Sequence, residues 1–396
     1  MVKSTFAYFI FALLLSCQDS PVESLTYTKI LVDNNVLVDK FDLSEFIQDV
    51  RIIPLSEEQG NFMVGVFKLI PFKGNYIAYD RRGSKLLLFD SAGKFQRVVM
   101  KNGDGPNDAL NIHDCWVNGD GNLQVYDYAQ FKIYTFDSSL AHFSVTKGSE
   151  FYHFSSIRDI PGTKSYAGYA DFNQFNAPYK GKLFHIGILN EQLDLTGVDN
   201  TFERIFEGVP WLTFSNHYFP YNDTLRFFES YNNSVYDIST QGATVRYKVA
   251  YERDNLPEDV LPIVREHLEK YKDPHTTPNE KAAFLKKYAR LNGRWIENEK
   301  YIYFVSRDSK GEFGDTFFTL YNKQQGKVVA NTKTFTVSTK FGLTLPTLEA
   351  YDKVTDEYIG VVNGIDLKDM VSRSNTLSGY LNQDLDVNYL VKVKFK

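Results

Sequence analysis

Two stretches of this chain, 47 residues apart, carry the same pattern, and this repeat constrains the fold more than any other feature. Between residues 77–91 and 124–138, six of fifteen positions are identical, namely Tyr79 and Tyr126, Asp80 and Asp127, Lys85 and Lys132, and the Phe-Asp-Ser at 89–91 and 136–138. Each copy consists of short β-branched and aromatic runs separated by polar turn residues. A strand-rich unit of this length is typical of one blade of a β-propeller.

We predict an all-β fold, a six-bladed β-propeller over residues 27–396, because six blades fit the chain length better than seven or eight. The aromatic content of 15% favours such a fold, in which large rings fill the space between packed sheets. The expected blades cover residues 60–99, 111–145, 154–206, 211–249 and 294–329, with a sixth built from 333–337, 348–351, 357–362 and the C-terminal strand Val387–Phe395.

One region interrupts the strand pattern. Residues 257–271 place Val260, Val264 and Leu268 four residues apart, as an amphipathic helix does. A second helix is expected over Asn279–Leu291, ending at Asn292-Gly293. Together they predict an αα-hairpin, at about residues 257–292, inserted between blades four and five.

The two ends of the chain offer strands that can close the ring. Thr26–Val38 and Asp49–Leu55 are rich in β-branched residues, and Val387–Phe395 has strand composition at the other end. Propellers commonly complete one blade with strands from both ends, which removes open sheet edges. We predict that Thr26–Val38 lies in the same sheet as Val387–Phe395.

The N-terminus predicts export and lipid anchoring. Residues 1–16 contain Lys3 and the apolar run Phe6–Leu15, which is too short for a stable membrane span and suits a signal peptide. The run ends in Leu-Leu-Ser before Cys17, which resembles a bacterial lipobox. A short buried helix is the alternative. Lipidated Cys17 and a polar tether to residue 26 would anchor the protein to the outer membrane, facing the periplasm or the exterior.

Charge and cysteine content exclude some classes. The net charge of −5 and the lack of a basic stripe argue against a nucleic-acid partner. If Cys17 is lipidated, Cys115 has no partner for a disulfide, and its apolar surroundings suggest a small buried hydrophobe. We expect a monomer without a cofactor.

No sequence motif for catalysis is present. The Gly-rich stretch 101–108 lacks the ending of a phosphate-binding loop, and 118–122 lacks the later ligands of a calcium loop. The best candidates for polar residues at the mouth of the central channel are His113, Asp114, Arg158, Asp159 and His217. The first four follow Ile112 and Ile157 at equivalent places, where innermost strands should begin. Alternatively, Asp114 and Asp159 accept hydrogen bonds from the backbone at strand starts.

The sequence resembles the six-bladed, NHL-like β-propeller lipoproteins of Gram-negative gut-type bacteria. The resemblance lies in Phe46–Leu55, Tyr76–Phe89, the Gly-Asp-Gly-Pro turn at 103–106, the repeat at 126–137 and the C-terminal Asp386–Lys396. Departures are Asp108 and Tyr389, where the family often has Glu and Pro. Members mostly have no assigned activity, so the resemblance implies a fold and no catalytic residues.

Two function classes remain open. The first is a binding module for a glycan, peptide or protein partner, because propellers present loops at the ends of a rigid ring. The second is a metal-dependent lactonase or hydrolase, which requires side chains such as His113, Asp114, Asp159 and His217 to converge on one ion.

The anchor can be tested directly. We expect Cys17→Ala to move the protein from the membrane fraction to the soluble fraction and to abolish labelling with a fatty acid, because the thiol is the acylated group. A variant that still sediments with membranes and carries the label would contradict lipidation at Cys17.

Overall fold

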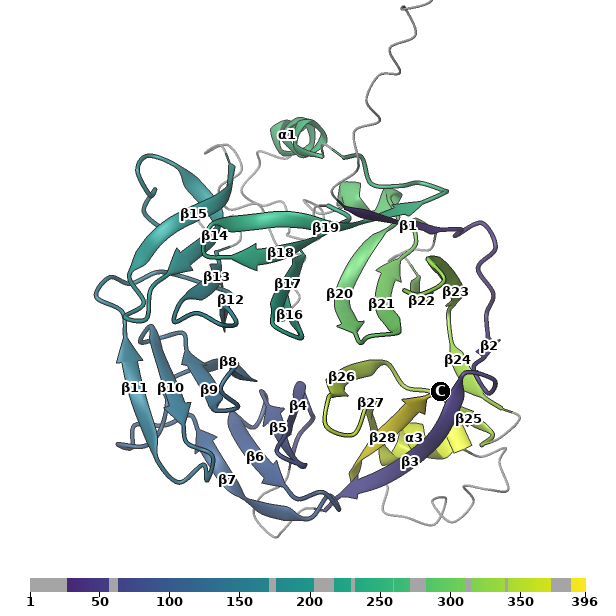
Figure 1. The fold of residues 1–396 in the computed structure, drawn as a ribbon, viewed down its shortest axis with the longest axis horizontal. Coiled ribbons are helices and arrows are strands. Elements are labelled where there is room, and N and C mark those ends of the chain that lie inside the picture. The colour runs from purple at the N-terminus through teal and green to yellow at the C-terminus, as the bar shows by residue number, and fades with distance from the viewer. Residues whose placement is uncertain are drawn as a thin grey trace, which may run out of the picture.

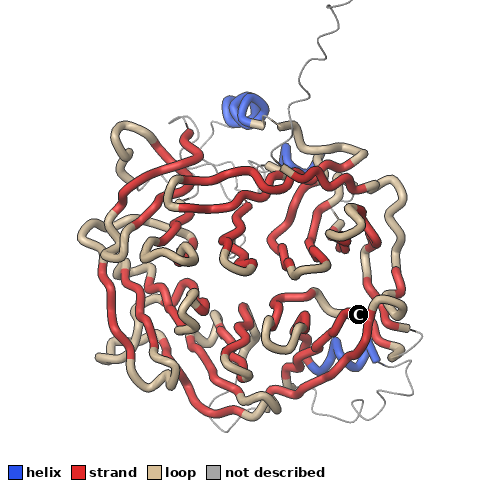
Figure 2. The backbone as a smooth tube through the Cα atoms, viewed as in Figure 1, coloured by secondary structure: helices blue, strands red, loops and turns tan. Residues whose placement is uncertain are grey.

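The computed structural model describes residues 27–56, 63–170, 176–202, 217–228, 232–258, 260–270, 283–310, 315–338, 341–371 and 386–396. These residues form seven β-sheets arranged around a central axis (Figures 1 and 2). The signal segment, Cys17 and the tether lie outside the described residues, so the predictions made for them stay predictions.

Six larger sheets, called here sheets one to six, have four or five strands each, and the first strand of each lies nearest the axis. Sheet one contains β4 (Lys68–Phe72), β5 (Asn75–Asp80), β6 (Lys85–Phe89) and β7 (Phe95–Lys101). Sheet two contains β8 (Ile112–Val117), β9 (Leu123–Asp127), β10 (Lys132–Phe136) and β11 (Phe143–Lys147). Sheet three contains β12 (Ser156–Asp159), β13 (Tyr166–Tyr169), β14 (Leu183–Leu189) and β15 (Leu195–Phe202).

The remaining larger sheets follow the same order. Sheet four contains β16 (Tyr218–Tyr221), β17 (Thr224–Phe228), β18 (Ser234–Ser239) and β19 (Gly242–Tyr251), with β1 (Thr28–Val32) added at its outer edge. Sheet five contains β20 (Arg290–Glu297), β21 (Tyr301–Arg307), β22 (Thr316–Asn322) and β23 (Lys327–Thr332). Sheet six contains β26 (Leu348–Asp352), β27 (Glu357–Asn363), β28 (Asn388–Phe395) and β3 (Ile47–Leu55).

The propeller prediction is confirmed, and the count of six blades is wrong, because the described residues form seven sheets. The seventh has three short strands, β2 (Phe41–Asp42), β24 (Phe335–Val337) and β25 (Leu343–Thr344). It lies at the outer edge between β23 and β3 (Figure 1). The sequence prediction placed β24 in blade six, but β24 pairs with β2 instead. Strand composition alone does not identify the partner that a short apolar segment pairs with.

The ring is closed by two strands from opposite ends of the chain, although not by the predicted pair. β28 pairs antiparallel with β3 from Asn388 opposite Leu55 to Phe395 opposite Ile47. The N-terminal strand β1 instead runs parallel to β19 in sheet four. Both N-terminal segments have strand composition, so the prediction of closure was correct and the choice of Thr26–Val38 was wrong.

The residues repeated in the sequence tie each inner strand to its sheet. Asp127, at the end of β9, accepts hydrogen bonds from the backbone N–H of Leu110 (2.8 Å) and of Ala129 (3.0 Å). Its equivalent Asp80 accepts from Val64 (2.9 Å) and Gly83 (2.8 Å). Both carboxylates are fully buried. Each therefore fixes the segment that enters the inner strand to the turn that leaves the second strand, which explains why the Tyr-Asp pair recurs.

Neighbouring sheets pack face to face through apolar side chains. Tyr79 and Leu86 of sheet one and Cys115 and Val125 of sheet two belong to one cluster in which these four residues are at most 1% exposed. Burial of a side chain of this size contributes roughly 1.5–3 kcal/mol. Burial also raises the pKa of the Cys115 thiol to about 12, which fits a small hydrophobe better than a nucleophile.

The predicted αα-hairpin is not supported. Its first part is the helix α1 (Leu261–Lys270), but the second comprises a 3₁₀ turn, η2 (Ala283–Lys287), after which β20 begins. The predicted helix was to end at Asn292-Gly293, but these residues belong to β20, which pairs with β21. The pairing has a register shift between Leu291 and Trp295. A further helix, α3 (Gly364–Val371), was not predicted. Within the described residues, neither helix has the length and apolar character to span a bilayer.

Removing β28 tests the closure. Deletion of 388–396 takes an internal strand out of sheet six and exposes the unpaired edges of β27 and β3. We expect aggregation or loss of the cooperative thermal transition. The matched control is a truncation that removes the chain up to Val32, because β1 is an outermost strand whose one partner among the described strands is β19. This control should melt cooperatively at a lowered temperature. A cooperative melt of the C-terminal deletion near that of the intact protein would contradict closure by β28.

Candidate functional site

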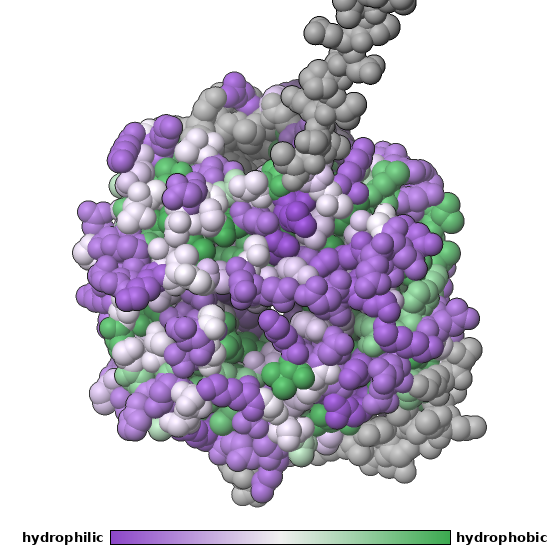
Figure 3. All heavy atoms as spheres, viewed as in Figure 1, coloured by the Kyte–Doolittle hydropathy of each residue, from purple (hydrophilic) through white to green (hydrophobic). Residues whose placement is uncertain are grey.

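A cavity of about 1850 Å³ occupies one end of the central channel. It is lined by the inner strands of all six larger sheets and by the turns that follow β8, β12, β16, β20 and β26. The volume exceeds the roughly 300–1,000 Å³ of most small-molecule sites. On the face of the molecule drawn in Figure 3, hydrophilic residues predominate around the centre. The cavity is therefore large, and its walls are strands of six sheets.

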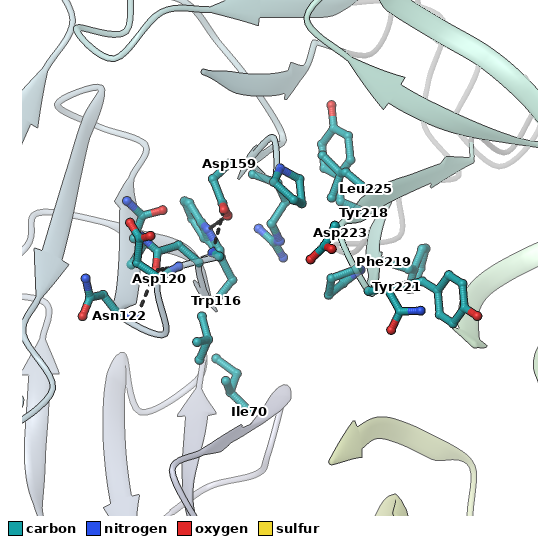
Figure 4. A pocket seen from close by; sticks show the side chains of 18 of the residues that line it. Ile70, Trp116, Asp120, Asn122, Asp159, Tyr218, Phe219, Tyr221, Asp223 and Leu225 are labelled. Carbon is teal, nitrogen blue, oxygen red and sulfur yellow. Dashed lines mark hydrogen bonds between the residues drawn. The ribbon is translucent and has the colours of Figure 1, made fainter. Parts of the chain in front are cut away.

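Two walls of the cavity face each other across open space. Figure 4 shows Trp116, Asp120 and Asp159 on one wall and Tyr218, Tyr221 and Asp223 on the other. Tyr221 is half-buried, as are Tyr166 and Tyr351, which line the cavity from sheets three and six. Aromatic residues and carboxylates are thus both present on each of the two walls.

A buried carboxylate connects sheets one, two and three at the cavity wall. Asp114 on β8 accepts a hydrogen bond from Lys68 Nζ (2.8 Å). It also forms a bidentate ion pair with Arg158, in which Nη1 donates to Oδ2 and Nη2 donates to Oδ1 at 3.2 Å. Burial alone would raise the pKa of Asp114, but the charges of Arg158 and Lys68 hold it below its usual value. Asp114 also accepts from the backbone of Cys115, at 2.8 Å.

Arg158 and Asp159 hold Trp116 between them. The Arg158 guanidinium lies 4.8 Å from the centre of the Trp116 ring, a cation–π contact. The indole N–H donates to Asp159 at 2.8 Å, and the backbone N–H of Gly119 donates to the same carboxylate at 2.9 Å. Burial raises the pKa of Asp159, and these two hydrogen bonds partly offset that rise. Asp114 and Asp159 therefore both accept hydrogen bonds from backbone N–H groups, as the alternative interpretation of the sequence expected, and Asp114 also forms the ion pair with Arg158.

A second network joins sheets four and five. Glu297 accepts hydrogen bonds from Arg226 (3.1 Å), Lys323 (2.9 Å), Tyr247 (2.9 Å) and Trp295 (3.3 Å). Arg226 also pairs with Asp237. Burial would raise the pKa of Glu297, and the neighbouring Arg226 and Lys323 lower it. Glu297 lines the cavity, but its four donors leave it little capacity to bind a ligand.

A third network links sheets six and one away from the cavity. Lys392 lies 2.6 Å from Glu357 and 3.7 Å from Asp352, and it donates to Tyr76 at 2.8 Å. Arg51 pairs with the same Glu357. Each of the three networks therefore crosses a boundary between sheets.

The predicted site residues divide into two groups. Arg158 and Asp159 line the cavity, and Asp114 lies directly behind them. His113 and His217 do not line it. A register shift between Ile112 and Asp114 makes His113 an extra residue, and its ring packs 4.9 Å from that of Tyr128. His217 is buried with its ring 4.3 Å from that of Tyr169. Neither histidine therefore contributes to this cavity.

The sequence prediction missed Lys68, Trp116, Gln124, Tyr221 and Glu297, all of which line the cavity. The one local signal for Lys68 is a lone basic residue at the start of an apolar strand. Its partner Asp114 lies 46 residues away in sequence, which no local pattern encodes. Within the described ranges, no group of three or more His, Cys, Asp or Glu side chains is placed to hold a metal ion.

Residues 28–389 match the family described as a domain of unknown function, DUF4934. The chain belongs to this family. No curated protein matches the sequence. The DUF4934 match takes the place of the NHL-like lipoprotein family expected from sequence, and the propeller fold is the part of that expectation that holds.

Among solved structures, this DUF4934 chain is similar to a "Putative exported protein" of Bacteroides fragilis NCTC 9343, with a TM-score of 0.70 and 14% identity over 94% of this chain and 100% of that one. It is also similar to a DUF4221 member from Bacteroides vulgatus (TM-score 0.49, 9% identity, 88% and 97% coverage). A gluconolactonase from Xanthomonas campestris is more distant (TM-score 0.44, 10% identity, 89% and 92% coverage). At 14% identity, the likeness to the Bacteroides fragilis protein shows a common fold and not a common ligand or activity.

The role of Asp114 can be measured by urea unfolding. Asp114→Asn leaves Lys68 and Arg158 without their buried counter-charge, so we expect a loss of about 3–5 kcal/mol at neutral pH. Because the pKa of Asp114 is lowered, its stabilising contribution is present above the unfolded value of about 3.9 and is lost as the pH falls through the folded value. The difference between the variant and the wild type should therefore shrink in acid.

Asp120→Asn is the matched control, since this residue lies in an exposed turn of the same cavity. We expect a change within about 0.5 kcal/mol. Equal effects of the two substitutions, or a difference for Asp114 that stays constant into acid, would contradict the assignment.

Proposed function

We propose that this protein is an exported, lipid-anchored binding module that holds a glycan chain in the central cavity. The cavity carries the proposal, because its 1850 Å³ accommodates several linked residues of a polymer rather than one metabolite. The lipobox-like segment ending in Cys17 supports export and anchoring.

The lining supports a glycan over the other ligands considered. Tyr166 and Tyr351 are half-buried aromatic residues in the cavity lining. Tyr221 also lines the cavity, with Lys323 Nζ 4.0 Å from the centre of its ring. A sugar ring has C–H groups on its faces, which pack against the negative face of an aromatic ring. Its hydroxyls donate to carboxylates such as Asp120 and Asp223, which line the opening without an ion pair among the described residues. Binding of a peptide or protein instead of a glycan is the result that would contradict this proposal.

A metal-dependent hydrolase has less support. That reading needs His113, Asp114, Asp159 and His217 to converge, but neither histidine lines the cavity. Asp114 is occupied by two cations. Propeller folds host many functions, so the distant likeness to a gluconolactonase does not favour hydrolysis here.

A glycan screen tests the proposal. We expect the purified protein to retain polysaccharides or oligosaccharides on an array, and Tyr351→Ala to weaken binding of the best ligand up to about tenfold through loss of ring stacking. Tyr27→Ala is the matched control, because this half-buried ring packs against Lys248 away from the cavity. It should leave affinity unchanged. Retention of peptides but not glycans, or equal effects of the two variants, would overturn the glycan assignment.

A further inference from the structure

The cavity extends further from the central axis between sheets two and three than elsewhere. In sheets one, four, five and six, its described lining residues lie on the innermost strand, in the turn that follows it or, for Leu225, on the second strand. In sheet two they continue to Thr135 on β10 and to residues 145–147 on the outermost strand, β11. Residues 191–192, in the turn between β14 and β15 of sheet three, line the same region. This outward extension of the cavity is called here the side arm.

The side arm crosses the whole width of sheet two. From β8 to β11 there are three strand spacings of about 4.8 Å, or roughly 14 Å in total. At the inner end, Trp116 lies on the wall of the central cavity (Figure 4). At the outer end, Val145 on the edge strand is 46% exposed. A groove of this length suits a chain molecule better than a compact one.

The floor of the side arm is a row of neighbouring side chains on sheet two. Trp116 pairs with Gln124 across β8 and β9, and Gln124 pairs with Thr135 across β9 and β10. Residues directly opposite each other in paired strands lie on the same face of a sheet, and here that face is turned toward Tyr166 of sheet three. All four residues line the cavity.

The same row is apolar where sheet one faces sheet two. There it consists of Ile70, Ile77 and Leu88, which pack in the cluster between those two sheets. In the 47-residue repeat, Gln124 and Thr135 stand at the places of Ile77 and Leu88. The change to polar residues has a cost, because Gln124 is 3% exposed and its Oε1 has no hydrogen-bond partner among the described residues. A row that packing does not favour is expected at a binding surface.

Gln124 orients two hydroxyl groups, one from each sheet. Its Nε2 donates to Thr135 Oγ1 at 3.0 Å and to the Tyr166 hydroxyl at 3.1 Å. Each hydroxyl accepts with one lone pair and keeps its own proton to donate. Both residues are half-buried, and burial raises the pKa of Tyr166, so its hydroxyl stays protonated at neutral pH. The side arm thus offers a pair of O–H donors.

We propose that a linear glycan extends from the central channel into the side arm, where the hydroxyls of Thr135 and Tyr166 donate to oxygen atoms of the sugar chain. This inference rests on the proposed function and names the class of ligand, a polysaccharide or long oligosaccharide rather than a short sugar. The floor carries no charged side chain, and on the rim Lys164 is balanced by Glu191 at 3.4 Å. These groups suit neutral hydroxyls.

The first measurement compares probes of different length on the purified full chain. The probes are cellohexaose, xylohexaose and mannohexaose with the corresponding disaccharides, and affinities are measured by calorimetry. We expect at least one hexasaccharide to bind about tenfold or more tightly than its disaccharide, because the longer chain contacts the channel and the side arm together.

The double variant Thr135→Val, Tyr166→Phe removes the two hydroxyls and keeps the size of both side chains. We expect it to weaken binding of that hexasaccharide about tenfold, as the loss of two hydrogen bonds implies, and to melt within about 3 °C of the wild type. The matched control makes the same two changes at Thr28 and Tyr27, which are half-buried and do not line the cavity. It should leave the affinity unchanged.

The second measurement locates the bound chain and needs neither hydroxyl variant. Thr146→Cys places a thiol at the outer end of the side arm, and a bound hexasaccharide should slow its alkylation by iodoacetamide several-fold. Gln96→Cys, on the exposed outermost strand β7 of sheet one, is the control and should react at the same rate with and without the sugar. Cys115 is buried with a pKa raised to about 12, so it contributes no background.

The results separate this inference from the proposed function. If hexasaccharides bind no more tightly than disaccharides, or bind without slowing alkylation at position 146, the side arm is not part of the site although the channel still binds glycans. A weakened affinity that comes with a large drop in melting temperature would assign the row a structural role instead. If no saccharide binds here or on the array, the proposed function fails as well.

Discussion

The pairing of β3 with β28 is the contact on which the rest of this structure depends. It joins residues 47–55 to residues 388–395 through backbone hydrogen bonds, so the two ends of the chain lie in one sheet. β28 is an internal strand, with β27 on its other side. Without it, sheet six would lose its continuity and the inner strand β26 its support. The cavity has walls on all sides because this pairing completes the ring.

Contacts between sheets are of two kinds with different consequences. Apolar clusters such as the one around Tyr79 and Val125 contribute most of the favourable free energy, because they remove large areas from water. The ion-pair networks add less net stability, since desolvation of buried charges offsets much of their attraction. Their geometry nonetheless sets the position of one sheet against the next, because Asp114 or Glu297 accepts hydrogen bonds from two sheets at once.

What the sequence could predict follows from the range of each interaction. The Tyr-Asp repeat predicted the propeller because each aspartate accepts hydrogen bonds from backbone groups within about 17 residues. Both partners of the bond therefore lie inside one repeat, and the sequence pattern recurs with the repeat. The ring closure was assigned to Thr26–Val38, although Ile47–Leu55 is the segment that pairs with β28. Both N-terminal segments have strand composition, and neither sequence indicates which of them pairs with a strand over 300 residues away.

The count failed for a related reason, since nothing in Phe335–Val337 marks it as a partner of β2 rather than of β26. Of the residues chosen for their places at the starts of inner strands, Arg158 and Asp159 line the cavity and Asp114 pairs with Arg158 behind it, while Lys68 was missed. His113, chosen by the same reasoning, does not line the cavity, and a register shift in β8 between Ile112 and Asp114 makes it an extra residue in the strand.

The position of Lys68 on a strand rather than in a turn bears on how the cavity can select a ligand. Turns around the opening tolerate substitution, and their side chains adapt to what they meet. Lys68 and Arg158 project from β4 and β12, whose backbones are fixed by pairing and whose side chains are held by one shared carboxylate. Side chains held in this way are preorganised, so this part of the wall needs no further ordering when a ligand enters. The inner strands would therefore provide the fixed part of the binding surface, and the turns above them the part that adapts to a ligand.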